Sequence, residues 1–248
     1  MDNQFLRAEM LFGGEAMDVL RRSHVAVLGL GGVGSYVAEA LVRSGIGELT
    51  LVDEDTVSLT NLNRQIESLH STLGRPKAEV LADRFRDINP EADLHPIVGR
   101  YDEKSREDFF STPYDYIADA IDLVSPKLDL IETAHTRNIP ILSALGTGNK
   151  LDPSLLEITD ISKTYGCPLA RVIRKELRAR GIDHTRVIFS PEEPVPAAGG
   201  GETPPPGRRS VPASIVWVPG CAGLMMGGEI VQDLIRRAGI VPKDSNIM

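Results

Sequence analysis

The stretch that decides the fold runs from residue 27 to residue 65 and reads VLGLGGVGSYVAEALVRSGIGELTLVDEDTVSLTNLNRQ. An apolar run leads into Gly29-Leu-Gly31-Gly32-Val-Gly34, and a helical pattern follows. Glycines at such a junction let the backbone approach a phosphate, to which the helix presents its N–H groups. Asp53 ends the next apolar run, 19 residues after Gly34, where a carboxylate can bind a ribose diol. The stretch therefore predicts a phosphate and ribose site, and leaves both NAD and ATP open as ligands.

Strand-like and helix-like runs alternate through the first 145 residues. Strands are predicted from HVAVLGL, ELTLVD, DLHPIV, YDYIADAI and IPILSAL, and helices from residues 33–44, 76–89 and 125–138. This order and spacing require right-handed crossovers, and so predict an α/β, Rossmann-like, doubly wound, mainly parallel sheet with helices on both faces. We expect a single domain over residues 1–248, with its nucleotide-binding core at residues 5–145.

Residues 146–248 read as a C-terminal extension of that core. Strands from LEITDIS and RVIFS flank a helix that opens at Pro168 and closes at Gly181. Residues 191–212 carry seven prolines and four glycines, so we expect a mobile loop there. ASIVWV, at residues 213–218, predicts a buried strand before a buried helix. Prolines and glycines interrupt the uncharged run 210–228, which therefore does not predict a membrane span.

Composition narrows the class of protein. A net charge of −8 gives no global basic field that would recruit nucleic acid. The two cysteines, Cys167 and Cys221, form neither a disulfide framework nor a zinc-binding Cys-x-x-Cys pair. The start, MDNQFLRAEM, lacks the layout of a signal peptide, which predicts a cytoplasmic protein. The five histidines fall on separate predicted elements without metal-binding spacing, and no role is assigned to them.

Polar residues just after the predicted strands favour ATP over NAD. Asn61 and Arg64 follow the second strand, Lys77 starts the next helix, and Asp122 follows the fourth strand. Because the carboxyl ends of parallel strands line one crevice, these groups are expected to converge. Two cations suit a triphosphate, and a carboxylate suits Mg²⁺. The local alternatives are that Arg64 and Lys77 are solvated charges and that Asp122 caps a helix.

Four motifs together resemble the adenylating domain of the ThiF-type, ubiquitin-activating superfamily. They are GxGGxG, LVDxDxVxxxNLxRQ, GxxK at a helix start, and an aspartate that closes a strand, and they span about residues 5–145. The resemblance implies that the fold binds Mg-ATP and transfers AMP to a carboxylate, usually the C-terminal glycine of a ubiquitin-like protein.

The resemblance also implies roles for individual residues. By motif, the phosphate turn is formed by Gly29, Gly31, Gly32 and Gly34, and Asp53 binds ribose. The phosphates are contacted by Asn61, Arg64 and Lys77, and Asp122 positions magnesium. Arg7, in FLRAEMLFGGEA, resembles the arginine that enters the partner subunit's site in a homodimer. The implied catalytic residues are therefore Arg64, Lys77, Asp122 and Arg7, and the implied assembly is a homodimer.

The rest of the chain is similar to the tRNA threonylcarbamoyladenosine dehydratases, through INPEADLHP and LLEITDISKTYGCPLARVIRKELRARGI. That similarity implies ATP-dependent activation of a threonyl carboxylate on a modified tRNA adenosine, followed by cyclising dehydration. One alternative is an adenylyltransferase for a sulfur-carrier protein, although such enzymes usually carry two Cys-x-x-Cys pairs. A nicotinamide-dependent oxidoreductase and a non-catalytic nucleotide-binding scaffold are also open at this point.

A tRNA substrate requires a basic surface. Residues 171–186 hold six basic and two acidic side chains, and Arg208 and Arg209 add to them. The alternative for this helix is a solvated face with Val172, Ile173 and Leu177 turned inward. Cys167, just before the helix, is an alternative acceptor thiol for a ubiquitin-like protein. A sulfur-transfer or electron-transfer protein is a further partner to test.

Overall fold

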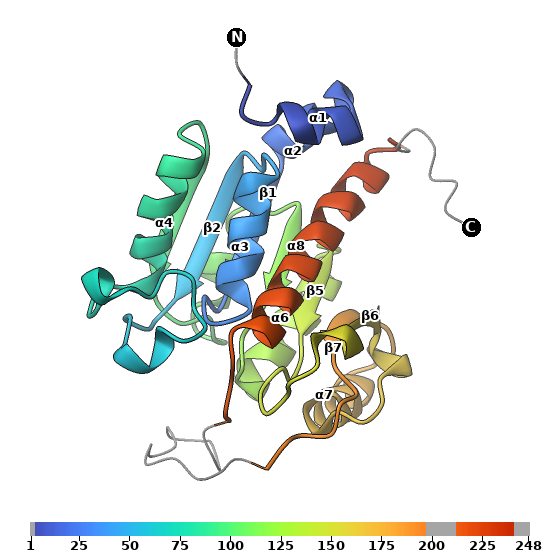
Figure 1. Cartoon of the computed structure of the whole chain (residues 1–248). Helices are drawn as coiled ribbons and strands as arrows, with labels where there is room; N and C mark the ends of the chain where they lie inside the picture. The colour runs from blue at the N-terminus through green and yellow to red at the C-terminus, as the bar shows by residue number, and fades with distance from the viewer. Residues whose placement is uncertain (1–2, 197–211, 241–248) are drawn as a thin grey trace.

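Seven strands form one sheet in the computed structural model, which describes residues 3–196 and 212–240 (Figure 1). The strands are β1 (His24–Leu28), β2 (Glu48–Asp53), β3 (Asp93–Val98), β4 (Tyr116–Asp119), β5 (Ile141–Ala144), β6 (Glu157–Asp160) and β7 (Arg186–Phe189). Their order is β3-β2-β1-β4-β5-β7-β6, and among these described strands only β6 with β7 pairs antiparallel. The predicted mainly parallel sheet is confirmed. Because β7 pairs with β5, the C-terminal residues extend the sheet of the core.

Helices cover both faces of the sheet, as predicted. They are α1 (Leu6–Phe12), α2 (Gly14–Arg22), α3 (Gly34–Arg43), α4 (Lys77–Ile88), α5 (Arg106–Phe109), α6 (Val124–Thr136), α7 (Pro168–Ala179) and α8 (Trp217–Arg237). Short 3₁₀ turns are η1 (Leu59–Asn61), η2 (His70–Thr72), η3 (Pro153–Leu155) and η4 (Ile161–Lys163). One apolar core packs α2, α3, α4 and α8 on one face, and a second packs α5, α6 and α7 on the other. A strand buried on both faces, such as β1, is accordingly apolar at every residue after His24.

The strand order reverses beside β1, and this reversal positions the site. β2 and β3 lie on one side of β1, whereas β4 and β5 lie on the other. The loops after β1 and β4 therefore leave the same edge of the sheet side by side, and Ala120 N donates to Leu28 O at 2.8 Å. In open parallel sheets such a reversal opens a ligand crevice at the carboxyl ends of the strands.

The strand predicted from ASIVWV is wrong. Residues 213–215 have no regular structure, and the helix α8 already begins at Trp217. Pro219 is the third helical residue, where a missing N–H costs no intrahelical hydrogen bond. α8 then crosses α3 closely, since a Cβ atom at Gly223 would lie 2.4 Å from Val33 O. The glycines and apolar residues that made this stretch ambiguous serve a helix–helix contact.

The predicted loop 191–212 is described only at its two flanks, because residues 197–211 lie outside the described part, as do Arg208 and Arg209. Asn149 joins both flanks: its carbonyl accepts from Val195 N and its Oδ1 accepts from Ala213 N, each at 2.7 Å. Within residues 3–196 and 212–240, no helix combines the length and apolar character needed to cross a membrane.

Candidate nucleotide-binding and activation site

The glycine turn between β1 and α3 is held in shape by Asp53. The Asp53 carboxylate ends β2 and accepts from Leu30 N at 2.6 Å and from Asp55 N at 2.8 Å. Gly29 has φ +84°, and a Cβ there would lie 2.7 Å from Ala120 O, so only glycine fits. Burial raises the pKa of Asp53. A carboxylate has about four lone-pair sites, which leaves capacity for a ribose diol after these two bonds.

The segment after β2 folds back over the glycine turn. A Cβ at Gly32 would lie 3.5 Å from Arg64 Cγ, and one at Gly31 would lie 3.6 Å from Gln65 Nε2. Arg64 Nη1 donates to Thr60 O at 2.8 Å, which keeps the guanidinium beside the turn. The structure thus brings Arg64 to the predicted phosphate site.

Asn61 and Gly34 act on the backbone of the site. Asn61 is buried, and its Oδ1 accepts from Ser58 N at 3.0 Å, so this oxygen shapes the loop that carries Arg64. A Cβ at Gly34 would lie 1.8 Å from Gly29 O, so the α3 start packs directly on the turn. Both residues therefore shape the loops around the glycine turn.

Lys77 approaches the same place from the first residue of α4. Its side chain is only 5% exposed, and Nζ donates to Asp55 Oδ2 at 2.9 Å. The Glu39 carboxylate on α3 accepts from Arg84 on α4 at 2.8 and 2.9 Å, which ties the two helices together. A buried ammonium held at a helix start beside the glycine turn suits an anionic ligand.

Buried polar atoms without hydrogen-bond partners gather around the turn. Among the described residues, these orphan atoms include Ser35 Oγ, Gln65 Oε1, Ser68 Oγ and both carboxylate oxygens of Glu67. Burial raises the pKa of Glu67 to about 7, with Lys77 and Asp53 among its charged neighbours. Unsatisfied buried polar groups are rare and mark places that receive a ligand or water. Sequence reasoning missed Glu67, because nothing in RQIES distinguishes a buried glutamate from an exposed one.

The loop after β4 carries Asp122 and is anchored by a buried ion pair. Asp119, the last residue of β4, is fully buried and accepts from Lys127 Nζ at 2.6 Å. Its other oxygen accepts from Ile121 N at 3.0 Å. Asp122 lies exposed on this loop, at the same sheet edge as Gly29. The sequence predicted Asp122 here but did not predict the Asp119–Lys127 pair that fixes the loop.

The match to known proteins decides the family. The family model described as "ThiF family" matches residues 5–245. The chain belongs to the ThiF family. This membership decides between the two ligand classes, in favour of an ATP-type adenylating fold over a nicotinamide enzyme.

Individual relatives agree over nearly the whole ThiF-family chain. The chain is 43% identical over 244 residues to a tRNA threonylcarbamoyladenosine dehydratase of Bacillus subtilis, covering 95% of this chain and 96% of that one. It also matches the crystal structure of the Escherichia coli tRNA N6-threonylcarbamoyladenosine dehydratase in complex with ATP, with a TM-score of 0.85 and 33% identity over 95% of each chain. The AMP complex of that protein gives a TM-score of 0.87.

In this ThiF-family chain, Arg7 lies far from its own nucleotide turn. Arg7 is exposed on α1, and α1 packs at the carboxyl end of α3, where Phe5 lies 3.6 Å from a Cβ built at Gly45. The glycine turn precedes the other end of the ten-residue helix α3, about 15 Å away at 1.5 Å per residue. Figure 1 shows α1 beyond the opposite end of the sheet from the loops that follow the strands.

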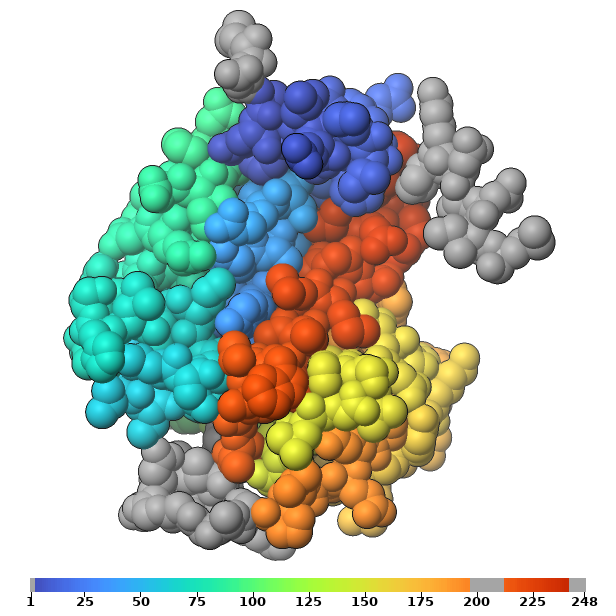
Figure 2. Space-filling model, viewed as in Figure 1, coloured from blue at the N-terminus to red at the C-terminus, as the bar shows by residue number. Residues whose placement is uncertain are grey.

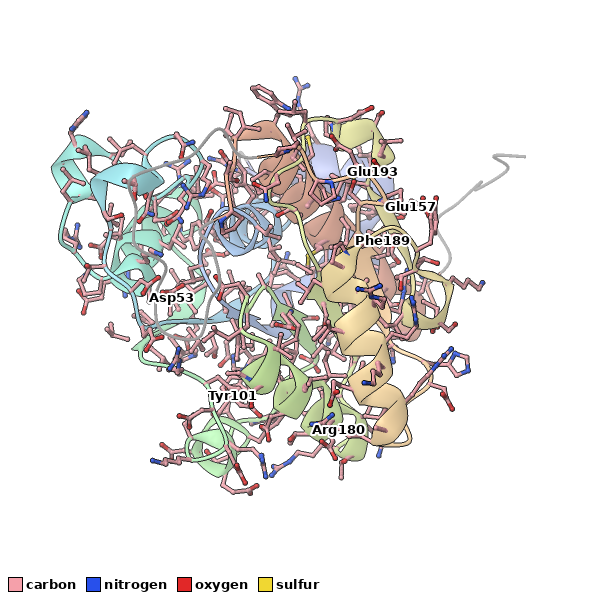
Figure 3. All side chains as sticks on the ribbon, turned by 90° about the horizontal axis from the view of Figure 1, so that it is seen from below. Asp53, Tyr101, Glu157, Arg180, Phe189 and Glu193 are labelled. Carbon is pink, nitrogen blue, oxygen red and sulfur yellow. The ribbon has the colours of Figure 1, made fainter. Side chains whose placement is uncertain are left out.

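The basic helix α7 begins at the same sheet edge as the nucleotide loops. Cys167 caps α7 and lies beside the loop after β5, since a Cβ at Gly146 would be 3.4 Å from its Sγ. Figure 3 looks onto this edge from below, with Asp53 on one side and Phe189 and Glu193 on the other. Cys167 is only 4% exposed, which argues against its alternative role as an acceptor thiol.

Two residues of α7, Val172 and Arg174, lie in surroundings other than those predicted from the sequence. Ile173 and Leu177 are buried as predicted, but Val172 is 43% exposed, because it lies one position away from the inward stripe. Arg174 donates to Thr164 O and Oγ1 at 2.6 and 2.5 Å, so it anchors a loop. Arg171, Lys175 and Arg178 are exposed at positions i, i+4 and i+7, and form one basic stripe.

Proposed function

We propose that this chain uses ATP to activate the threonyl carboxylate of N6-threonylcarbamoyladenosine in tRNA, and then closes the ring with loss of water. The observation that carries the proposal is the 43% identity to the Bacillus subtilis dehydratase over nearly the full length of both chains. The clustering of the glycine turn, Arg64 and Lys77 supports it independently, since an anionic phosphate ligand fits that cluster.

The proposed reaction has two steps. A carboxylate oxygen attacks the α-phosphorus of ATP, and pyrophosphate leaves. A carbamoyl nitrogen or oxygen of the same nucleoside then attacks the activated carbonyl carbon and releases its proton to solvent, and AMP departs with that carboxylate oxygen. The nucleophile and electrophile belong to one molecule, so ring closure benefits from a high effective concentration. The step requires no protein thiol, which agrees with the burial of Cys167.

Lys77 and Arg64 stabilise the phosphate charge in this proposal. A lysine that is almost fully buried acts in a low-dielectric setting, where it stabilises developing negative charge more than a solvated one would. Lys77 Nζ donates to Asp55, and an ammonium has three donors, so two N–H groups are left for a phosphate in this scheme. Asn61, Gly31, Gly32 and Asp53 hold the loops and sugar in the same scheme.

Magnesium is proposed at Asp122. The residue offers a hard carboxylate oxygen at the sheet edge that carries the phosphate turn, and Mg²⁺ prefers one or two carboxylates together with phosphate oxygens. The Asp119–Lys127 pair fixes the loop that presents this carboxylate. When bound, Mg²⁺ would neutralise phosphate charge and orient the departing pyrophosphate.

The tRNA-binding surface is proposed along the α7 stripe of Arg171, Lys175 and Arg178. The stripe starts at the nucleotide edge of the sheet, so a tRNA bound there can reach the activation site. Phosphate contacts from such a stripe position a nucleic acid without reading its sequence. A tRNA substrate also agrees with the cytoplasmic location predicted from the sequence. A sulfur-transfer or electron-transfer partner stays an untested prediction.

A homodimer is proposed because Arg7 is too far from its own site to act there. Three apolar side chains of the same helix are strongly exposed, namely Leu6, Met10 and Leu11 at 55, 79 and 76%. Leu224 of α8 is 50% exposed, and Figure 2 shows α1 and α8 adjoining on one face. Apolar residues gathered on one face are typical of a protein interface. In a twofold dimer through this face, Arg7 would enter the partner's site.

The nucleotide products test the activation step. Adenylyl transfer releases AMP and pyrophosphate in equal amounts to the cyclised nucleoside, whereas phosphoryl transfer would release ADP and phosphate. Chromatography of the nucleotides after reaction with modified tRNA separates the two. ADP as the product would contradict the adenylate intermediate while leaving the dehydration itself intact.

A further inference from the structure

Two histidines and a glutamate converge at the sheet edge opposite the nucleotide site. His24 and Glu48 are the first residues of β1 and β2, and the sheet register pairs them directly. His95 on β3 pairs with Thr50 on β2. Because side chains two residues apart share a face, His24, Glu48, Thr50 and His95 all point to the same face of the sheet.

The ligating atoms of these three side chains are close to one another. Glu48 Oε1 lies 3.3 Å from His24 Nδ1 and 2.9 Å from His95 Nε2, and all three atoms fall within 4.8 Å of one another. Tetrahedral zinc with bonds of about 2.0–2.1 Å places its ligand atoms about 3.3–3.4 Å apart. The glutamate distances are close to that value before any adjustment. His95 is 42% exposed on the edge strand, so its ring can rotate.

A second observation points to a cation at this place. His24 Nε2 lies 2.8 Å from Thr50 Oγ1, so the other ring nitrogen, Nδ1, is the one that faces Glu48. A hydrogen bond on one ring nitrogen is how metal-binding histidines are usually oriented.

The surrounding charge is also negative. Asp93 Oδ1 lies 3.6 Å from His95 Nε2, and Asp115 Oδ2 accepts from the backbone N–H of His24 at 2.7 Å. Three carboxylates therefore surround two imidazoles. Asp93 can complete the coordination as a fourth ligand, or water can.

We propose that His24, Glu48 and His95 form a binding site for a divalent transition-metal ion, with zinc as the expected occupant. Two imidazoles and one carboxylate suit zinc, whereas magnesium and calcium prefer oxygen ligands only. The site lies at the amino ends of the strands, away from the nucleotide, so its role is structural. It links the edge strand β3 to β2 and β1. His24 and Glu48 lie 24 positions apart in the sequence, and Glu48 and His95 lie 47 positions apart, so a bound ion would join distant parts of the chain.

The test is zinc binding by the full-length, tag-free protein, measured by competition with a chromophoric chelator in the presence of Mg-ATP. One equivalent of zinc is expected. His95→Gln should weaken binding at least about tenfold, since even the loss of an outer-shell partner has that effect. The matched control is His184→Gln, because His184 is also an exposed histidine beside a carboxylate, at 3.3 Å from Asp160. The control variant should bind zinc like the wild type.

Two further measurements keep the outcome clear. Glu48→Gln should lose zinc binding as His95→Gln does, with circular dichroism showing that both variants are folded. Cobalt added to the wild type should give the visible d–d bands of a nitrogen- and oxygen-ligated ion, independently of any variant. Wild-type protein that binds no zinc at micromolar concentration, variants that bind it undiminished, or zinc that Mg-ATP displaces would each overturn the proposal.

Discussion

Glu67→Gln tests the electrostatics of the nucleotide site. Glu67 is 1% exposed, and burial raises its pKa from 4.5 to about 7, with Lys77 and the Ser35 hydroxyl opposing the shift in part. Since the folded-state pKa lies above the unfolded value, the protonated carboxyl is the form that the fold favours. Its contribution to stability is fully present below about pH 4.5 and is lost as the pH rises through about 7.

The magnitude follows from the shift of about 2.5 pKa units, at 1.36 kcal/mol per unit. Ionisation of Glu67 therefore costs the wild type about 3 kcal/mol of unfolding free energy at alkaline pH. Glutamine has the same shape and does not ionise, so the variant escapes this penalty. Relative to the wild type, it should gain about 2–3 kcal/mol between pH 5 and pH 8. At about 2–4 °C per kcal/mol, this corresponds to about 4–12 °C in Tm.

The assay is urea unfolding from pH 5 to pH 8 at a fixed protein concentration, followed by the fluorescence of the single tryptophan, Trp217. Any cost of burying the glutamine amide is independent of pH, so only the pH dependence of the difference is read. Glu79→Gln is the control, because Glu79 is exposed on α4, and its difference from the wild type should stay flat. A Glu67→Gln difference that stays constant, or falls as the pH rises, would contradict the predicted ionisation of Glu67.

Three further predictions concern the proposed reaction. Lys77→Ala should lower the turnover rate at least about 100-fold, as loss of a charge-stabilising donor does, and a rate near wild type would contradict its role. An equimolar mixture of Lys77→Ala and Arg7→Ala chains should recover about a quarter of wild-type activity. About half of the dimers then contain one chain of each kind, and in such a dimer one of the two sites has both an intact Lys77 and an intact Arg7 from the other chain. No recovery after subunit exchange would contradict the action of Arg7 across a dimer. The double variant Arg171→Glu, Lys175→Glu should weaken tRNA binding without changing ATP affinity. The slope of the logarithm of the tRNA binding constant against the logarithm of the salt concentration should fall in magnitude by about 1–2. Unchanged tRNA binding would show that α7 is only a solvated face.

The sequence predicted the features that depend on local pattern. Apolar runs located the strands of the core, helix-like patterns located α3, α4, α6 and α7, and the glycine motif located the turn between β1 and α3. The approach of Arg64 to Gly32 followed from strand order alone, because the carboxyl ends of parallel strands meet at one edge.

Features that depend on register and packing could not be predicted. The pairing of Asp119 with Lys127 and the burial of Glu67 depend on which face each residue turns inward, which the local sequence does not encode. His24 and His95 looked unrelated because their strands, β1 and β3, do not pair with each other and are joined only through β2. The absence of metal spacing along the sequence was therefore no guide to their proximity.

The ASIVWV error has a different cause. β-branched residues favour a strand, but tertiary context overrides that preference at Trp217 and Val218, where packing requires the start of a helix. Here the requirement comes from residues further along the chain, where Gly223 and Gly227 let α8 approach α3. A Cβ at Gly227 would lie 2.5 Å from Ala40 Cβ.

The most direct test of the proposed function is mass spectrometry of nucleosides from tRNA that carries linear N6-threonylcarbamoyladenosine. The tRNA is incubated with the purified protein and Mg-ATP, with ATP omitted and with Lys77→Ala as parallel controls. The proposed function predicts that the nucleoside loses the mass of one water only with ATP and wild-type protein. An unchanged nucleoside, with ATP bound and the protein folded, would contradict the assignment of tRNA as the substrate.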